Sequence, residues 1–102
     1  MYRLNISFAV EPDAVTAWTD LMRGKFIPYL RENGFQRLAL SRVLTEHHDG
    51  HFTFSLLMEL DDVAAYRRVT EELWDEYAQM NEMMFGTDVV WFMSLMKEIG
   101  NE

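Results

Sequence analysis

Alternating apolar and polar residues constrain the fold of this chain more than any other feature. From Tyr2 to Val10 every second residue is apolar, and the same alternation runs through the segment His51–Leu60. Side chains on a β-strand point alternately to the two faces of a sheet, so a period of two predicts strands with one buried face. Both segments are therefore expected to be strands of one sheet.

Apolar residues spaced three or four apart predict a helix after each of these two strands. The first helix begins at Glu11-Pro12-Asp13, because proline and acidic side chains favour a first turn, and it ends at Asn33-Gly34. Pro28 cannot donate a backbone hydrogen bond and predicts a kink. The second helix follows the capping pair Asp61-Asp62 and ends before Gly86. The resulting order is strand, helix, strand, strand, helix, strand.

The two remaining strands are predicted at Phe35–His47 and Asp88–Met96. Asp49-Gly50 is typical of a two-residue type I′ turn, which would pair His48 with His51. In that register Leu38, Leu40, Arg42 and Leu44 share a face with Thr53, Ser55, Leu57 and Glu59, opposite the helices. A slip of one residue would invert the second strand. The unbroken apolar run Val89–Met93 predicts a fourth strand that is buried on both sides.

Two helices cover only one face of such a sheet, and the other face would carry much apolar surface. A patch of this kind exceeds what monomers leave in water. We therefore predict a homodimer. Its interface is expected to contain Leu38, Leu40, Leu44, Leu57 and Trp91.

Polar side chains are mixed into the same open face. A few convergent polar groups within apolar walls are the usual composition of a ligand pocket. The sequence thus predicts a site for a small, flat, partly anionic molecule, with Arg3 or Arg42 as counter-charge. The alternative is that these groups pair with one another or with water across the dimer. The predicted lining residues are Arg3, Asn5, Ser7, Arg42, Thr53 and Ser55.

Composition excludes several classes of function. The chain of 102 residues has no cysteine and therefore no disulfide or thiolate metal site. Its formal charge of −8 argues against nucleic acid or an anionic membrane as a partner. No apolar run approaches the roughly 18 residues of a membrane span, and no signal peptide is recognisable. We expect one cytoplasmic domain over residues 1–102.

No motif for catalysis or for cofactor binding is present in the sequence. The three histidines, His47, His48 and His51, flank the hairpin turn. Two of them could chelate a metal, but two ligands leave a site incomplete. We interpret them as a solvated hairpin tip and expect no metal and no cofactor.

The order of elements, with two helices packed on one sheet, resembles the ferredoxin-like fold, which implies the strand order 4-1-3-2. The segment from Trp18 to Phe35 reads W-x-x-L-M-x-x-x-x-I-P-x-L-x-x-x-G-F. It is most similar to a small bacterial family within the dimeric α/β-barrel superfamily, domain-of-unknown-function family 4286. The resemblance implies an α+β sandwich whose sheets pair face to face in a dimer.

The chain also resembles the antibiotic-biosynthesis monooxygenase and haem-degrading group. That likeness places Asn5 on the first strand and Trp74 on the second helix, where the haem-degrading branch carries functional residues. The second helix has no histidine to hold a haem. Three hypotheses remain: a small-molecule-binding barrel, a non-catalytic dimerisation or protein-interaction module, and a cofactor-free monooxygenase-like enzyme.

Overall fold

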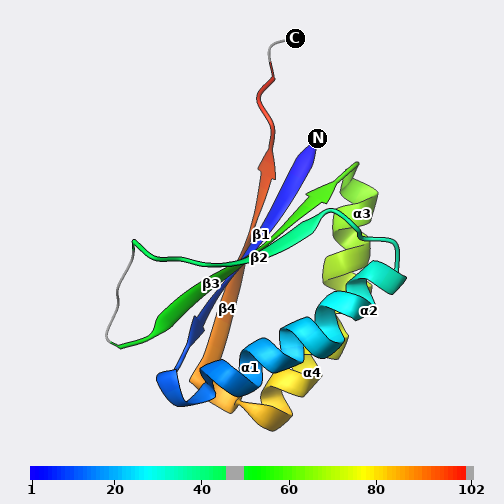
Figure 1. The fold of residues 1–102 in the computed structure, drawn as a ribbon. Coiled ribbons are helices and arrows are strands. Elements are labelled where there is room, and N and C mark those ends of the chain that lie inside the picture. The colour runs from blue at the N-terminus through cyan, green and yellow to red at the C-terminus, as the bar shows by residue number, and fades with distance from the viewer. Residues whose placement is uncertain (46–49, 101–102) are drawn as a thin grey trace.

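The computed structural model describes residues 1–45 and 50–100, and within these ranges four strands form one antiparallel sheet in the order β2-β3-β1-β4. This is the predicted order, 4-1-3-2, counted from the other edge. β1 lies at the centre, between β3 and β4 (Figure 1). The strands are β1 (Tyr2–Val10), β2 (Leu38–Arg42), β3 (Phe52–Leu60) and β4 (Val89–Lys97).

Each helical connection contains a π-helical turn. The first consists of a 3-10 turn (Pro12–Ala14), α1 (Val15–Leu21), a π turn (Met22–Phe26) and α2 (Ile27–Glu32). The second consists of α3 (Val63–Arg68), a π turn (Val69–Leu73), α4 (Trp74–Met84) and a 3-10 turn (Gly86–Asp88). The break expected at Pro28 is thus a π turn over the residues just before it, which include Gly24, whose carbonyl Pro28 has no N–H to bond.

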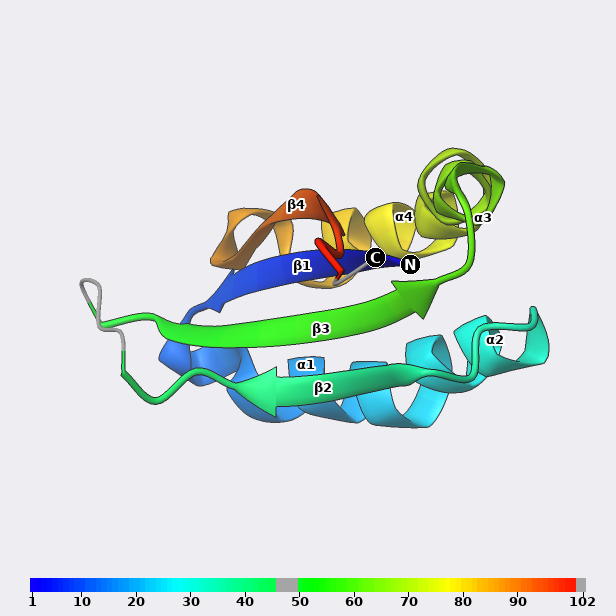
Figure 2. The ribbon, with the colours of Figure 1, turned by 90° about the horizontal axis from the view of Figure 1, so that it is seen from above.

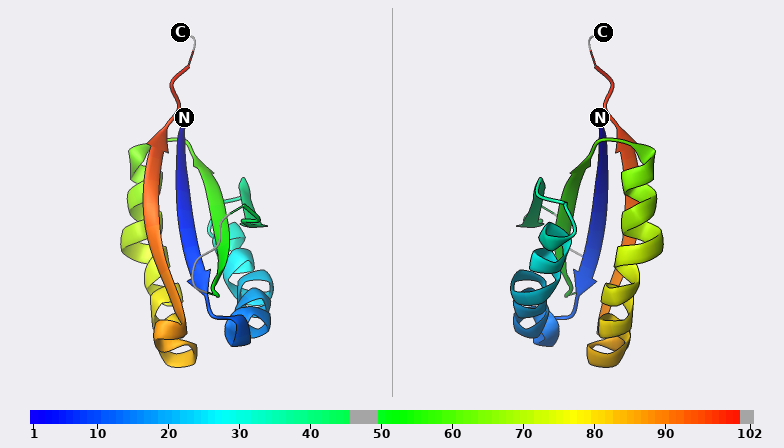
Figure 3. Two further views of the ribbon diagram at one scale, coloured as in Figure 1. Left: turned by 90° about the vertical axis from the view of Figure 1, so that its left-hand side faces the viewer. Right: turned by 90° about the vertical axis from the view of Figure 1, so that its right-hand side faces the viewer.

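Both helical connections lie on the same face of the sheet. The first runs alongside β2 and β3, and the second runs alongside β4 (Figures 2 and 3). The opposite face of the sheet carries no helix in the described part of the chain, as the left-hand view of Figure 3 shows. We call this surface the open face.

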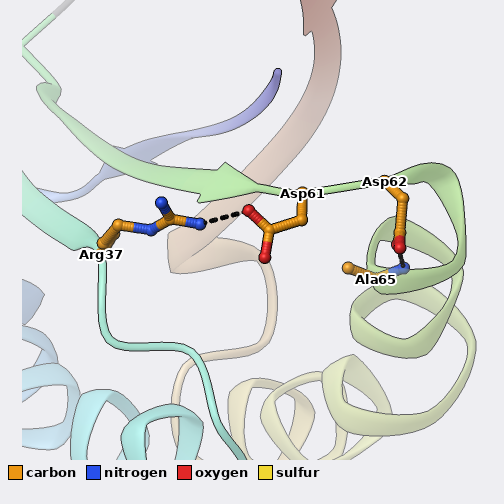
Figure 4. Close-up of polar contacts among 4 residues, drawn as sticks. All are labelled: Arg37, Asp61, Asp62 and Ala65. Atoms are coloured by element: carbon orange, nitrogen blue, oxygen red, sulfur yellow. Dashed lines mark hydrogen bonds and ion pairs between the residues drawn. The ribbon is translucent and has the colours of Figure 1, made fainter.

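Caps and a turn residue fix the helix ends as the sequence predicts. The Asp62 carboxylate accepts a hydrogen bond of 2.8 Å from the Ala65 amide at the start of α3 (Figure 4). Next to it, the Arg37 guanidinium donates to the Asp61 carboxylate at 2.6 Å. This hydrogen bond and the charge of Asp61 raise the pKa of Arg37. Gly34 follows α2 with φ 99°, the left-handed conformation that suits glycine.

The core lies between the helices and the even-numbered residues of β1 and β3. Aromatic rings fill its centre: Phe8 lies 4.9 Å from Trp18 and 5.7 Å from Tyr77, centroid to centroid. The sequence predicts one buried face for each of these two strands, and residues on that face and on the helices that cover it are buried, which confirms the face assignment of β1 and β3. These buried residues include Leu4, Ile6, Phe8, Trp18, Phe54, Leu56, Leu73 and Trp74.

A buried chain of hydrogen bonds crosses this core from the first helix to β4. The Trp18 indole N–H donates to the Tyr77 hydroxyl at 2.9 Å, and that hydroxyl donates to Asn81 Oδ1 at 2.8 Å. The Asn81 amide group donates to the carbonyls of Gly86 and Val89, both at 3.2 Å. Each polar group is thereby satisfied without water, which burial requires. The chain fixes the turn that starts β4.

Burial raises the pKa of the Tyr77 hydroxyl above its ordinary value, and the hydrogen bond from Trp18 offsets part of the shift. The unfolded chain therefore loses this proton at a lower pH than the folded chain. We expect the free energy of unfolding to fall as pH rises above about 10, by at most about 1.4 kcal/mol per pH unit from this group. Urea denaturation at several alkaline pH values measures the slope.

A Tyr77→Phe variant is expected to lower the stability and also to reduce that alkaline slope. Tyr66→Phe, which removes a phenol that is only half-buried, is the matched control. An alkaline slope that is the same in Tyr77→Phe as in the unaltered protein would contradict this assignment.

The predicted hairpin register is wrong. Arg42 pairs with Phe54, three positions from the expected partner Leu57, and Leu38 pairs with Met58. Because three is odd, the shift turns β2 over and places Leu38 and Leu40 on the helix-facing side. The hairpin is longer than a two-residue turn. The physical reason is burial, since these two leucines pack against the core.

His47 and His48, which are predicted at the hairpin tip, lie outside the described residues. His51 stands just before β3. Its Nε2 atom lies 2.6 Å from the carboxylate of Glu11, which follows β1. In the described part of the chain, no three His, Asp or Glu side chains gather in a way that could hold a metal ion.

Candidate ligand pocket on the open sheet face

The open face is made by the odd-numbered residues of β1 and β3 and by their partners on the edge strands. Asn5 pairs with Leu57 on β3 and with Ser94 on β4, and Ser7 pairs with Ser55 and Phe92. Because the two inner strands alternate strictly, all their polar side chains fall on this side. The structure therefore brings together four of the six predicted lining residues: Asn5, Ser7, Thr53 and Ser55.

Three of these residues are joined by hydrogen bonds. The Ser55 hydroxyl donates to Asn5 Oδ1, and Asn5 Nδ2 donates to Ser7 Oγ at 3.1 Å. We call Asn5, Ser7 and Ser55 the polar triad. All three are half-buried although nothing covers this face in the described chain, because they stand on the two inner strands of the sheet with a strand on either side.

A hollow of about 300 Å³ adjoins the triad. Its floor is the central strand, where Ser7 and Ala9 have short side chains, and Phe92 on β4 forms a taller wall. Thr53 adds a second hydroxyl, from β3. The hollow thus results from small residues on the inner strand beside a large residue on the edge strand. Its described lining residues carry no charge: Ser7, Phe8, Ala9, Thr53, Val90, Trp91 and Phe92.

The two arginines predicted as counter-charges do not reach this hollow. Arg42 lies on the other face, where its guanidinium stacks 4.5 Å from the centroid of the Phe52 ring. Its assignment to the open face is wrong for the same reason as the hairpin register. Arg3 is on the open face, but it is four residues from Ser7, roughly 13 Å along the strand. It lies 3.7 Å from the Glu98 carboxylate.

The residues predicted for the dimer interface do not all lie on the open face. Leu57 is on the open face, opposite Asn5. Leu38 and Leu40 face the helices, and Leu44, beyond the end of β2, is 76% exposed. The Trp91 ring packs edge-on against Tyr77 at 5.4 Å between centroids, so it lies in the helix-facing layer and not on the open face.

The sequence does not reveal which row of apolar side chains on β4 lies on the open face. This row consists of Val90, Phe92 and Met96, which are 51%, 66% and 44% exposed. The unbroken run Val89–Met93 has no alternation from which a face could be read. The pairing of β4 with β1 identifies the row, because Phe92 stands opposite Ser7, which lies on the open face.

Comparison with known proteins now identifies the family. The model of the domain of unknown function DUF4286 matches residues 1–99. The chain belongs to this family. A search of curated proteins finds no match to the chain. None of the described helices is long and apolar enough to cross a membrane.

Solved structures share the fold of this DUF4286 chain at low sequence identity. A dimeric ferredoxin-like protein from an uncultured marine organism is 12% identical, with a TM-score of 0.70 over 96% of this chain and 97% of that one. A Bacillus halodurans protein of the ethyl tert-butyl ether (EthD) family is 11% identical, with a TM-score of 0.66 over 97% of this chain and 100% of that one. An antibiotic biosynthesis monooxygenase is 19% identical, with a TM-score of 0.65 over 98% and 100%. These likenesses establish the ferredoxin-like α+β fold.

Proposed function

We propose that this protein is a homodimer that binds a small planar molecule between its two facing sheets. The observation that carries the proposal is the uncharged hollow beside the polar triad, on the open face. A second copy placed over this face would turn the open hollow into an enclosed one. Apolar walls with a few placed hydroxyls are typical of ligand sites.

The open face suits a second copy of the same chain. The row of Val90, Phe92 and Met96 gives it an apolar edge. In the described strands its charged side chains are Arg3 and Glu59, one of each sign, and Glu98, which follows β4, lies beside Arg3. The open face therefore carries only a small part of the formal charge of −8 on each chain, and repulsion between two such faces is weak. The dimeric ferredoxin-like protein of similar structure supports this arrangement.

Light scattering coupled to gel filtration measures the assembly. We expect twice the 12.1 kDa mass of one chain at micromolar concentration. Phe92→Glu is expected to raise the dissociation constant of the dimer at least about a hundredfold, because both copies lose a buried phenyl ring. Met83→Glu, at a methionine 84% exposed on α4, is the matched control and should leave the mass unchanged. A 12.1 kDa species from the unaltered chain would contradict the dimer.

Ligand binding is tested by thermal shift with aromatic acids, quinones, flavins and haem. A compound at 100 times its dissociation constant stabilises the folded protein by about 2.7 kcal/mol. Ala9→Leu, which places a larger side chain in the hollow, is expected to abolish the shift. Ala39→Leu makes the same change on the open face of β2, outside the hollow, and should preserve it.

A non-catalytic dimerisation module is the second candidate, and the triad itself favours it. The three side chains already form hydrogen bonds with one another, as polar groups buried in a packed interface would need to. In that case the dimer forms, no compound shifts the melting temperature, and Ala9→Leu affects assembly alone.

A further inference from the structure

The hydrogen bonds of the polar triad run in one direction, from donor to acceptor, and end at Ser7. Ser55 donates to Asn5, and Asn5 donates through its amide nitrogen to Ser7. The Ser7 oxygen therefore acts as an acceptor within the chain of bonds, and its own hydrogen remains available. In the described part of the protein the Ser7 hydroxyl has no acceptor. The triad thus ends in a hydroxyl donor at the floor of the hollow.

The hydrogen bonds from Ser55 to Asn5 and from Asn5 to Ser7 strengthen the Ser7 hydroxyl as a donor. Successive hydrogen bonds polarise one another, and a hydroxyl that accepts a bond donates the next one more strongly. They also hold the Ser7 oxygen in place, which reduces the entropy lost when a ligand binds.

The surroundings of the hollow select against a charged ligand. Its described lining residues are uncharged, Arg3 lies beside Glu98, and Arg42 is on the other face. A carboxylate enclosed there would lose its hydration with no cation to compensate. A carbonyl oxygen pays a much smaller desolvation cost and needs a single donor. Phe92 offers a flat aromatic wall beside it.

We infer that the hollow takes an uncharged planar molecule and that Ser7 donates a hydrogen bond to its carbonyl oxygen. This inference rests on the proposed small-molecule site and adds the chemical class of its ligand. It replaces the partly anionic ligand that the sequence predicts, because the structure removes both arginines from the site.

Three probes of one ring system test the inference: indanone, indane and indane carboxylate. They share size and shape and differ in offering a neutral carbonyl, no oxygen, or a charge. NMR titration of the amide resonances of the intact homodimer measures each dissociation constant. Indanone is expected to bind about 2- to 12-fold more tightly than indane, the range of one neutral hydrogen bond, and the carboxylate more weakly than indanone.

Ser7→Ala is expected to remove the advantage of indanone over indane while indane binding is unchanged. Ser41→Ala makes the same substitution on the open face of β2, outside the hollow, and should retain the advantage.

Equal binding of indanone and indane to the unaltered protein would overturn the inference and leave the proposed site intact. Tighter binding of the carboxylate would do the same. Failure of all three probes to bind would overturn both. Since the probes are compared on the unaltered protein, the test does not depend on how well the variants fold.

Discussion

Truncation of Phe8 to alanine is expected to destabilise the protein by about 3–5 kcal/mol. Phe8 is fully buried on the central strand, and its ring lies against those of Trp18, Trp74 and Tyr77. Shortening it leaves a cavity that rigid rings on both helical connections cannot fill. The free energy of unfolding for a domain of this size is about 5–15 kcal/mol, so the loss is a large share of the total.

Urea denaturation followed by tryptophan fluorescence measures this change through the midpoint at an unchanged m-value. Met83→Ala, at an exposed position on α4, is the control and should lie within about 0.5 kcal/mol of the unaltered protein. A loss below about 1 kcal/mol for Phe8→Ala would mean that the aromatic cluster is not the centre of the core.

Replacement of Asn81 by alanine is expected to cost about 3 kcal/mol, an effect unusual for a polar residue. The substitution leaves the Tyr77 hydroxyl and the carbonyls of Gly86 and Val89 without their partner inside the protein. Each buried polar group left unsatisfied costs about 1–3 kcal/mol. Because these bonds hold the turn before β4, amide hydrogen exchange should also rise first at that end of β4.

Gln79→Ala, an exposed change on the same helix, is the matched control and should leave both measurements unchanged. Stability loss without faster exchange at the start of β4 would show that Asn81 does not act through that turn.

The fold could be predicted from the sequence wherever alternation and capping agreed. The strict alternation of Tyr2–Val10 and Phe52–Leu60 assigned both inner strands to the correct faces, and Asp62 and Gly34 marked helix ends by chemistry that is local in the sequence. The prediction failed where the turn sequence and the burial of side chains favour different registers. The Asp49-Gly50 turn signal implied one register for β2, but burial of Leu38 and Leu40 decides another.

The same distinction explains which residues of the candidate site could be predicted. Asn5, Ser7, Thr53 and Ser55 were predicted correctly as neighbours, because their faces follow from the two alternating strands. Arg42 was misplaced, since its side depends on the hairpin register. The wall formed by Phe92 was missed, because an apolar run without alternation does not reveal which residues face outward. The hollow itself depends on side-chain sizes across three strands, which only the paired register brings together.

The position of β1 in the sheet has a consequence for how the chain folds. β1 is synthesised before the other three described strands of the sheet and β4 after them, yet these two strands pair along their whole length, from Tyr2 with Lys97 to Val10 with Val89. The central strand therefore lacks one neighbour until β4 has been synthesised. Contacts between segments so far apart in sequence slow folding, because the entropy of closing the loop is lost before the contacts form. A nascent chain of this family can pair β1 with β3 early, but it completes its sheet only after β4 has left the ribosome.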